Sequence, residues 1–280
     1  MNKDQVLGMV VGGAIGDAFG APFEFQYPDQ IVAPDGYTTG GVHGVALGEY
    51  TDDTAMMLAA AEAYVESQDF SPDLIANNFK KWKTFGTYGT RDYVFDIGTT
   101  CSDALSAMSM QRPYAGKATI KSSGNGSIMR IAPAIAANHR NHLNAVGESV
   151  ALALMTHGNS DTIKYITAFV AEVFNVDSHK FDKLKYFEAA MDGSLGTGSI
   201  MQAYNVALFS EWKARGDFLK ALKIAVSFGY DTDTNACVTG MLVGARVGLS
   251  NIPEHLIKGL MNHDHILTIS NSLCDLGDKR

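Results

Sequence analysis

The chain has 280 residues, 46% of them hydrophobic and 19% charged, so it can bury a sizeable core as one large domain or two small ones. Its 22 basic and 30 acidic residues give a formal net charge of −8, which argues against a nucleic acid or an anionic membrane as the main partner. Three cysteines far apart, Cys101, Cys237 and Cys274, favour a reducing, cytoplasmic compartment over a disulfide framework.

Apolar residues recur at three- and four-residue spacing along most of the chain, which indicates amphipathic helices. In chain order the predicted helices cover residues 3–20, 53–67, 72–85, 98–110, 143–156, 161–174, 199–213, 217–228, 234–248 and 253–260. Alternating strands with hairpin turns are missing, and no glycine-rich break is long enough to be a domain linker. The prediction is a single all-α domain over residues 1–280, a multi-helix orthogonal bundle.

Small residues recur at every fourth position of two predicted helices. They are Gly8, Gly12, Gly16 and Gly20 in the first, and Ala236, Gly240, Gly244 and Gly248 in a late one. Each interior glycine costs about 1 kcal/mol relative to alanine, so this register indicates a close approach of two backbones. We expect both helices at the centre of the molecule, against each other. The first also resembles a signal peptide, but its apolar stretch is flanked by Asp4 and Asp17, and we expect it to be too short to span a bilayer and to be a core helix.

Two acidic motifs open predicted helices far apart in the sequence, TDDT at residues 51–54 and DTDT at residues 231–234. One such motif is explained by helix capping, since Asp and Thr side chains accept hydrogen bonds from free N–H groups and Asp suits the helix dipole. Two such motifs in one chain are harder to explain by capping alone. If they converge, four carboxylates share a small volume and repel one another unless some stay protonated or cations neutralise them.

Divalent cations would resolve this repulsion. Oxygen ligands without paired His or Cys favour Mg²⁺, Mn²⁺ or Ca²⁺ over Zn²⁺. Two ions can activate one water and polarise a substrate oxygen. The motifs together offer enough ligands for two ions: the carboxylates of Asp52, Asp53, Asp231 and Asp233, and the hydroxyls of Thr51, Thr54, Thr232 and Thr234.

Two further acids lie in unusual surroundings. Glu24 sits between Phe23 and Phe25, and a carboxyl group among aromatic rings tends to a raised pKa, which suits proton transfer. The alternative is a solvent-facing loop glutamate. Asp96 lies in the glycine-rich segment FDIG, where the alternative to a reactive role is a simple helix cap.

A Gly/Ser/Asn loop precedes a helix in KSSGNGSIMRIAPAIA, residues 121–136. Such a loop exposes backbone N–H groups that can hold phosphate, although the Gly-Lys-Ser/Thr ending of a P-loop is missing. His157, in MTHGNSD, lies at a predicted helix end, where it either serves the helix dipole or contacts a ligand.

Taken together and in this order, the segments GAIGDAFGAPFEF, YTDDTAMMLA, FDIG, GNGSIMRIAP, THGNSD and YDTDTNACVTGMLVGARVG resemble the ADP-ribosylglycohydrolase family over almost the whole chain. The resemblance implies an all-α bundle with a binuclear Mg²⁺ or Mn²⁺ centre. The ligands that it implies are Thr51, Asp52, Asp53, Asp231, Asp233 and Thr234.

The resemblance also implies roles for the residues outside the two acidic motifs. Glu24 matches a metal-site or proton-transfer carboxylate, and Asp96 a residue that handles substrate near the scissile ribose; with Asp53 they form the predicted catalytic set. His157 matches a histidine that contacts ADP-ribose. The diphosphate and ribose cradle is expected at Ser122, Ser123, Gly124, Asn125 and Gly126.

The sequence departs from the family pattern at two places. Ser199 stands where many members have an aromatic residue, which puts stacking on adenine from that place in doubt. The segment FDIGTTCSDAL replaces the commoner Asn and Arg of that helix start, which puts leaving-group selectivity in doubt.

The predicted function is metal-dependent hydrolysis at C1″ of an ADP-ribosylated protein or small substrate, with ADP-ribosyl-arginine as the first candidate. Two alternatives stay open: an inactive, crystallin-like ADP-ribose-binding protein, and a metal-dependent nucleotide phosphohydrolase. We expect a monomer without a membrane or nucleic-acid partner. The choice of acceptor is expected to lie in the loops at residues 26–48 and 86–98.

Overall fold

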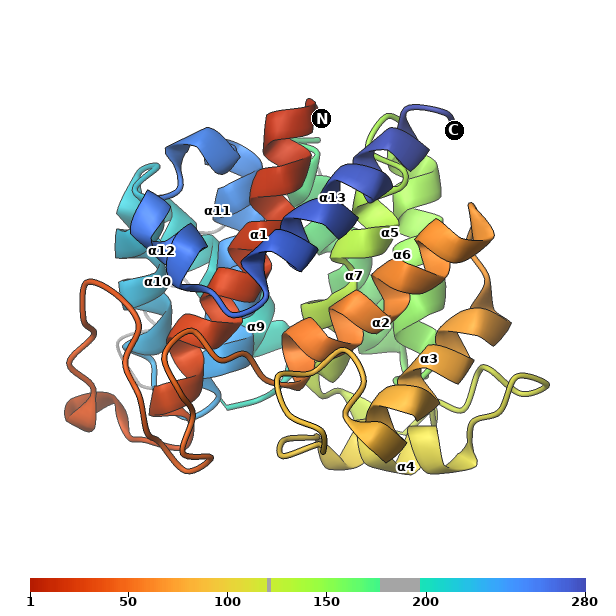
Figure 1. Ribbon diagram of the computed structural model, residues 1–280, viewed down its shortest axis with the longest axis horizontal. Helices are drawn as coiled ribbons and strands as arrows, with labels where there is room; N and C mark the ends of the chain where they lie inside the picture. The colour runs from red at the N-terminus through yellow and green to blue at the C-terminus, as the bar shows by residue number, and fades with distance from the viewer. Residues whose placement is uncertain (120–121, 177–196) are drawn as a thin grey trace.

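The computed structural model describes residues 1–119, 122–176 and 197–280 (Figure 1). Its α-helices are α1 (Lys3–Gly20), α2 (Asp52–Ser67), α3 (Pro72–Phe85), α4 (Thr99–Ala107), α5 (Ala132–Ala136), α6 (His142–Leu154), α7 (Ser160–Val173), α9 (Ile200–Ala214), α10 (Phe218–Val226), α11 (Thr232–Val247), α12 (Glu254–Gly259) and α13 (His263–Gly277). Short 3₁₀ turns are η1 (Ala21–Phe23), η2 (Pro28–Gln30), η4 (Asn125–Arg130) and η5 (Leu249–Asn251). Within these ranges there are isolated β-bridges but no strand, so the all-α prediction is confirmed.

The predicted helices are found within a few residues of their expected ends, with two informative differences. Helix α11 begins at Thr232, two residues before the predicted start, so the DTDT motif enters its first turn. Helix α13 was not predicted at all. It buries Ile266, Ile269 and Leu273 and packs against α1 and α2, closing the core on the side that faces the viewer in Figure 1.

Helices α1 and α11 pack antiparallel along their whole length, as their glycine register predicts. A Cβ on Gly12 would collide with the carbonyl oxygen of Gly240, and a Cβ on Gly240 would collide with that of Gly12. The same mutual exclusion holds for Gly8 and Gly244 one turn further along. The predicted close backbone approach is therefore confirmed, and it brings the end of α1 to the start of α11.

The N-terminal apolar segment is a core helix. Residues Lys3–Phe23 are long and apolar enough to cross a membrane, with a mean hydropathy of 1.5, so the expectation that the segment is too short was wrong. In the fold, however, 94% of that window is buried inside the protein. A helix that is apolar all round is typical of the centre of a large domain.

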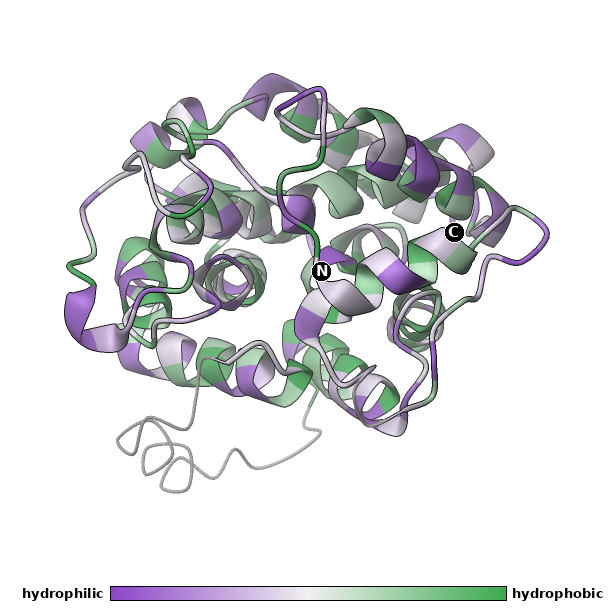
Figure 2. Cartoon of the chain, turned by 90° about the horizontal axis from the view of Figure 1, so that it is seen from below, coloured by the Kyte–Doolittle hydropathy of each residue, from purple (hydrophilic) through white to green (hydrophobic). Residues whose placement is uncertain are grey.

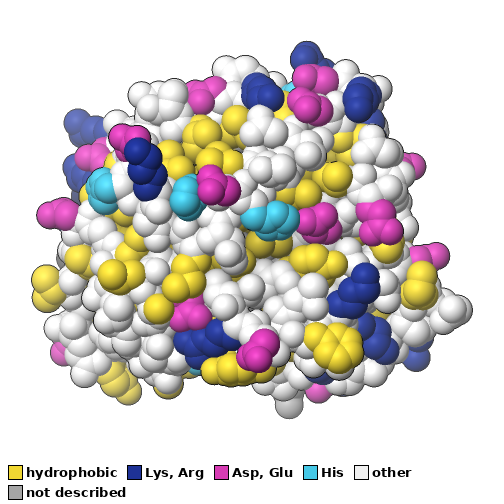
Figure 3. Space-filling view, viewed as in Figure 1, with side chains coloured by type: hydrophobic (Ala, Val, Ile, Leu, Met, Phe, Trp, Pro, Cys, Tyr) yellow, Lys and Arg dark blue, Asp and Glu magenta, His cyan; other side chains and the backbone are white. Residues whose placement is uncertain are grey.

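The surrounding helices turn their apolar side chains inward and their polar side chains outward (Figure 2). On the face seen in Figure 3, acidic and basic side chains are interspersed rather than gathered into a patch of one sign. Both termini lie at the top of Figure 1, where the Met1 amino group donates to the His139 carbonyl (2.8 Å) and His139 Nε2 lies 3.2 Å from Asp278. The opposite end of α1 is where the functional side chains gather.

The glycine register predicts a large difference between two Gly→Ala changes. Gly240→Ala places a methyl group against backbone that cannot yield, and we expect it to destabilise the fold by about 3 kcal/mol or more. Gly147 lies exposed in α6 with nothing within 4 Å of its would-be Cβ, so Gly147→Ala should stabilise the protein by about 0.5–1 kcal/mol. Urea unfolding of both variants measures the contrast, and equal midpoints would contradict the packing argument.

Candidate metal centre and substrate pocket

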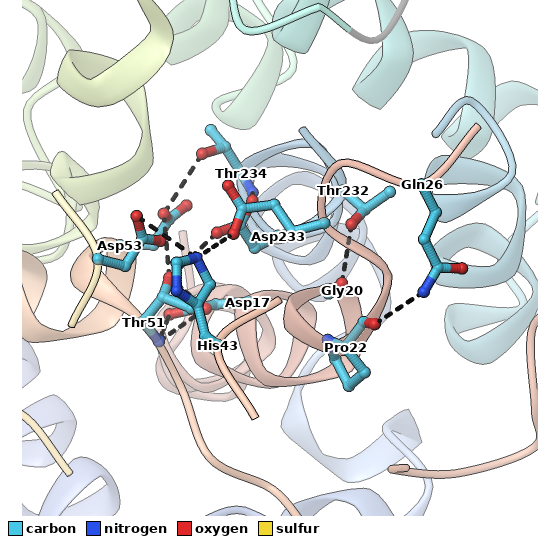
Figure 4. A network of polar contacts seen from close by, with 12 residues as sticks. Asp17, Gly20, Pro22, Gln26, His43, Thr51, Asp53, Thr232, Asp233 and Thr234 are labelled. Atoms are coloured by element: carbon cyan, nitrogen blue, oxygen red, sulfur yellow. Dashed lines mark hydrogen bonds and ion pairs between the residues drawn. The ribbon is translucent and has the colours of Figure 1, made fainter. Parts of the chain in front are cut away.

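The two acidic motifs meet in space. Thr51 Oγ1 lies 3.3 Å from an Asp233 carboxylate oxygen, and Thr234 Oγ1 lies 3.3 Å from Asp53 Oδ2. Figure 4 shows Thr51 and Asp53 at the start of α2 facing Asp233 and Thr234 at the start of α11. The predicted convergence of the two motifs is confirmed.

The start of α2 is capped by a residue from another helix. Asp17, on the last turn of α1, accepts hydrogen bonds from the backbone N–H groups of Thr51 (3.0 Å) and Thr54 (2.9 Å). It also accepts from both of their hydroxyls, at 2.8 and 2.6 Å. Thr51, the N-cap residue, makes no capping bond with its own side chain. Because Asp17 satisfies this helix end, Asp52 and Asp53 are not needed as caps.

The released carboxylates form two groups that share one residue. Ligand oxygens of Asp52, Asp96 and Asp233 lie within 4.8 Å of one another, and so do those of Asp17, Asp53 and Asp233. The adjacent acids Asp52 and Asp53 thus belong to different groups, bridged by Asp233. Asp53 Oδ1 is buried and has no hydrogen-bond partner. An orphaned carboxylate oxygen in an all-oxygen cluster fits a hard divalent cation.

Burial and mutual repulsion act in the same direction on these acids. Burial raises the pKa values of Asp52, Asp53 and Asp233 well above the usual range, and the neighbouring carboxylates raise them further. The carboxylates cannot all be ionised side by side in this volume without positive charge. Divalent cations would supply that charge, and oxygen ligands of this kind suit them.

Glu24 lies at the edge of this cluster, buried in the wall of a pocket. Burial, followed by repulsion from Asp96 and Asp231, raises the pKa of its carboxyl group to about 9. Its Oε2 atom lies 2.8 Å from Nε2 of His43, within hydrogen-bond distance. The solvent-facing alternative is therefore wrong. The expected rise of the Glu24 pKa is confirmed in direction, with burial as its largest cause and repulsion from the neighbouring acids adding to it.

Asp96 faces the same pocket from the loop before α4. It does not cap that helix, whose N-cap is Gly98 and has no side-chain bond. Burial, followed by repulsion from Asp17 and Asp231, raises the pKa of Asp96 to about 6. His43 Nε2 lies 3.8 Å from Asp96 Oδ1, so one imidazole bridges the two acids that the sequence predicts to be reactive.

A cavity of about 380 Å³ joins the acidic cluster to the glycine-rich loop. Its walls include Glu24, Asp52, Asp96, Ile97, Gly98, Thr99, Thr100, Gly124, Asn125, Gly126, His157, Asp231, Asp233 and Thr234. Asn125 Nδ2 donates to Asp231 Oδ2 at 2.9 Å, so the loop and the second acidic motif are directly linked. The cavity has room for a ribose and a phosphate group beside the carboxylates.

The predicted phosphate loop is only partly assembled at this cavity. Gly124, Asn125 and Gly126 line it, but Ser122 faces a neighbouring cavity of about 360 Å³ on the far side of Thr99 and Thr100. Ser123 turns away as well. Its hydroxyl accepts from Asn159 Nδ2 (2.7 Å) and lies 3.2 Å from Asp161 at the start of α7. The two serines thus stay predictions without support from the main cavity.

Ser199 has a local structural task. Its hydroxyl caps α9 by accepting from the Gln202 N–H group at 3.2 Å, and it pairs with Gly124 in an isolated bridge. The backbone N–H of Ile200 donates to the Ser123 carbonyl at 2.9 Å. Ser199 and its neighbour Ile200 therefore fix the glycine-rich loop to α9.

Two residues of the site were not predicted: Asp17 as a cap and His43 as a partner of Glu24. The GD pair at the end of the glycine helix is a usable signal for Asp17. His43 lies in an irregular loop with no periodic pattern. Arg91 holds that loop, since it donates to the His43 carbonyl (3.2 Å) and pairs with Glu49 (2.8 Å), so the two loops expected to choose the acceptor are tied together.

Comparisons with known proteins identify the family of this chain. A family model described as ADP-ribosylglycohydrolase matches residues 1–280. The ADP-ribosylarginine hydrolase Tri1 of Pseudomonas putida (strain GB-1) is 29% identical, over 97% of this chain and 78% of that one. The ADP-ribosyl-[dinitrogen reductase] glycohydrolase of Rhodospirillum rubrum is 25% identical, over 92% of this chain and 90% of that one.

A solved structure shares the architecture. An ADP-ribosylglycohydrolase-related protein complex superposes with a TM-score of 0.82 at 24% identity, covering 98% of both chains, which shows a common fold. The full-length family match, together with the two converging acidic motifs, leads to one conclusion: this chain belongs to the ADP-ribosylglycohydrolase family of hydrolases.

Proposed function

We propose that this protein hydrolyses the glycosidic bond between C1″ of ADP-ribose and a modified acceptor, with two divalent cations, Mg²⁺ or Mn²⁺, bound at the acidic cluster. The observation that carries the metal part is the pair of carboxylate groups bridged by Asp233, with the buried, unpartnered Oδ1 of Asp53. Thr51, Asp52, Asp53, Asp233 and Thr234 would hold the cations, together with Asp231, which the family resemblance adds although it belongs to neither carboxylate group and accepts from Asn125. When bound, they would neutralise the cluster and polarise substrate oxygens.

The chain's own residues would then orient the sugar and exclude water. The ribose would lie beside Asp52 and Asp96, and the diphosphate along Gly124 and Gly126 towards His157, all of which line the same cavity. Holding both ends of the ADP-ribose unit fixes C1″ relative to the carboxylates, which is a contribution of positioning.

Proton transfer is assigned to the two acids at the mouth of the cluster. Glycosidic cleavage passes through an oxocarbenium-like transition state and needs both a proton for the leaving group and a water to attack C1″. Glu24 and Asp96, which His43 joins, lie on the same cavity wall as Asp52. One would keep a proton for the leaving group while the other accepts one from water.

Arginine is the acceptor that the relatives favour. Two curated relatives are named ADP-ribosylarginine hydrolases, at 29% and 26% identity. The cavity beside Glu24 and Asp96 is acidic, which suits a departing guanidinium group. A cytoplasmic, monomeric protein without a membrane partner is part of the proposal, and the three buried free cysteines support the reducing compartment.

The test is release of free ADP-ribose from ADP-ribosylated arginine and serine peptides, each with Mg²⁺, with Mn²⁺ and with EDTA. We expect cleavage of the arginine linkage with metal and its loss in EDTA, restored by excess metal. Undiminished activity in EDTA contradicts the metal role, and cleavage of the serine linkage alone contradicts the acceptor. AMP released from free ADP-ribose would instead identify a nucleotide phosphohydrolase.

A further inference from the structure

The feature that the reaction scheme leaves unused is a buried cation under the glycine-rich loop. Arg130, at the end of η4, has 0% exposure, and among the described residues no carboxylate lies within ion-pair distance of it. Its Nη1 donates to the Gly126 carbonyl at 2.5 Å, and its Nη2 donates to Thr156 Oγ1 at 2.5 Å and the Leu152 carbonyl at 3.4 Å. Burying a guanidinium group without a carboxylate partner costs desolvation free energy. A role for Arg130 is therefore to be sought in the hydrogen bonds that it donates.

The chain of contacts continues from Thr156 to the pocket. Thr156 Oγ1 lies 2.8 Å from Nδ1 of His157. The other ring nitrogen, Nε2, faces the glycine-rich loop, since a Cβ on Gly124 would lie 3.3 Å from it. The absence of side chains at Gly124 and Gly126 leaves that edge of the ring open to the cavity that His157 lines.

The direction of the hydrogen bonds along this chain follows from the chemistry of its first member. A guanidinium can only donate, so Thr156 Oγ1 accepts from Arg130. The hydroxyl proton of Thr156 is then free to be donated to Nδ1 of His157. The sulfur of Cys101 is the competing acceptor near this hydroxyl, and a thiol sulfur accepts weakly.

His157 is a neutral imidazole, which carries one N–H proton, on either Nδ1 or Nε2. Burial, followed by the charge of Arg130, lowers its pKa to about 3. A neutral imidazole donates from one nitrogen and accepts at the other. If Nδ1 accepts from Thr156, the proton resides on Nε2, where it points into the cavity as a hydrogen-bond donor.

We propose that Arg130 is a positioning residue that, through Thr156, holds His157 in the tautomer with its proton on Nε2, so that the ring presents an N–H donor to an oxyanion of the substrate. The relay itself is a property of the free protein. The identity of the oxyanion, a phosphate oxygen of ADP-ribose, rests on the proposed function.

The tautomer is measured directly by ¹⁵N NMR of protein labelled at histidine, because the two nitrogens of a neutral ring have distinct shifts. His157→Gln identifies the signal among the eight histidines. We expect the Nε2–H form in the native protein, its loss or mixing with the Nδ1–H form in Thr156→Val, and its retention in the matched Thr156→Ser, which keeps the hydroxyl. Arg130→Lys, which keeps the charge but not the forked donors, should weaken the preference.

ADP-ribose affinity gives the second readout, by calorimetry on the same proteins. We expect Kd to rise about tenfold in Thr156→Val and to stay near the native value in Thr156→Ser. An Nδ1–H signal in the native protein, or an Nε2–H signal unchanged in Thr156→Val and Arg130→Lys, overturns the relay. An intact relay in a protein that binds no ADP-ribose leaves the relay standing and counts against the proposed substrate.

Discussion

Asp233→Asn should lower kcat for ADP-ribose release about a thousandfold or more while the protein stays folded. Asp233 belongs to both carboxylate groups of the cluster, so under the proposed function its loss would weaken cation binding at both groups at once. The Asn oxygen can still accept the 2.9 Å hydrogen bond from the Thr234 N–H group, which keeps the start of α11 in place. Activity is measured at saturating substrate with excess Mn²⁺ or Mg²⁺.

The same variant separates metal binding from folding. The native protein should gain about 2.7 kcal/mol of stability at a metal concentration a hundredfold above Kd, and Asp233→Asn should gain little. Without metal the variant should melt at the native temperature or above it, because one buried, repelled carboxylate has been removed. Asp275→Asn, the same change at a side chain that is 63% exposed on α13, is the control. Native metal-dependent stabilisation in Asp233→Asn would refute the bridging role.

Asp17→Ala should lower the free energy of unfolding by about 3–5 kcal/mol, with and without metal. The change leaves two backbone N–H groups and two hydroxyls at the buried start of α2 without their acceptor. Asp17→Asn retains an accepting oxygen and should fall between the native protein and Asp17→Ala. Urea unfolding with EDTA present measures the effect of the cap apart from that of the cations.

The two aspartate variants therefore have opposite signatures. Asp233→Asn loses activity and keeps its metal-free stability, whereas Asp17→Ala loses stability first. Its activity falls as a consequence, because the turn that carries Asp52 and Asp53 is no longer held. If Asp17→Ala unfolded at the native urea concentration, the start of α2 would be satisfied by other groups, and the two carboxylates could not be regarded as released by Asp17.

The features that could be predicted from the sequence are those whose physical cause is local or periodic. The glycine register of α1 and α11 is visible as a four-residue repeat, and it correctly predicted that the two helices lie against each other. The repeat of acids and threonines predicted the cluster for a similar reason. One such motif is explained by helix capping, whereas two that converge bring carboxylates close enough to repel one another. Helix α13 was missed although its sequence carries the signal, since Ile266, Ile269, Leu273 and Leu276 recur at three- and four-residue spacing and are buried.

The features that were missed depend on contacts between distant parts of the chain. The cap of α2 comes from Asp17, 34 residues before Thr51, so no local rule could assign it. His43 meets Glu24 only because Arg91 and Glu49 hold its loop over the cavity. The raised pKa of Glu24 was expected from its apolar surroundings, but the added repulsion from Asp96 and Asp231 could not be predicted, because these acids are distant in the sequence.

The pairing of α1 with α11 also sets the order in which the protein can be made. Gly20 and Thr232, which touch in the fold, are 212 residues apart in the chain. At roughly 5–20 residues per second, α1 leaves the ribosome roughly 10–40 s before its partner exists. During that interval α1, which is apolar enough to enter a membrane, lacks the helix against which it is buried in the fold. The acidic centre can be completed only after the second acidic motif, at residues 231–234, has emerged.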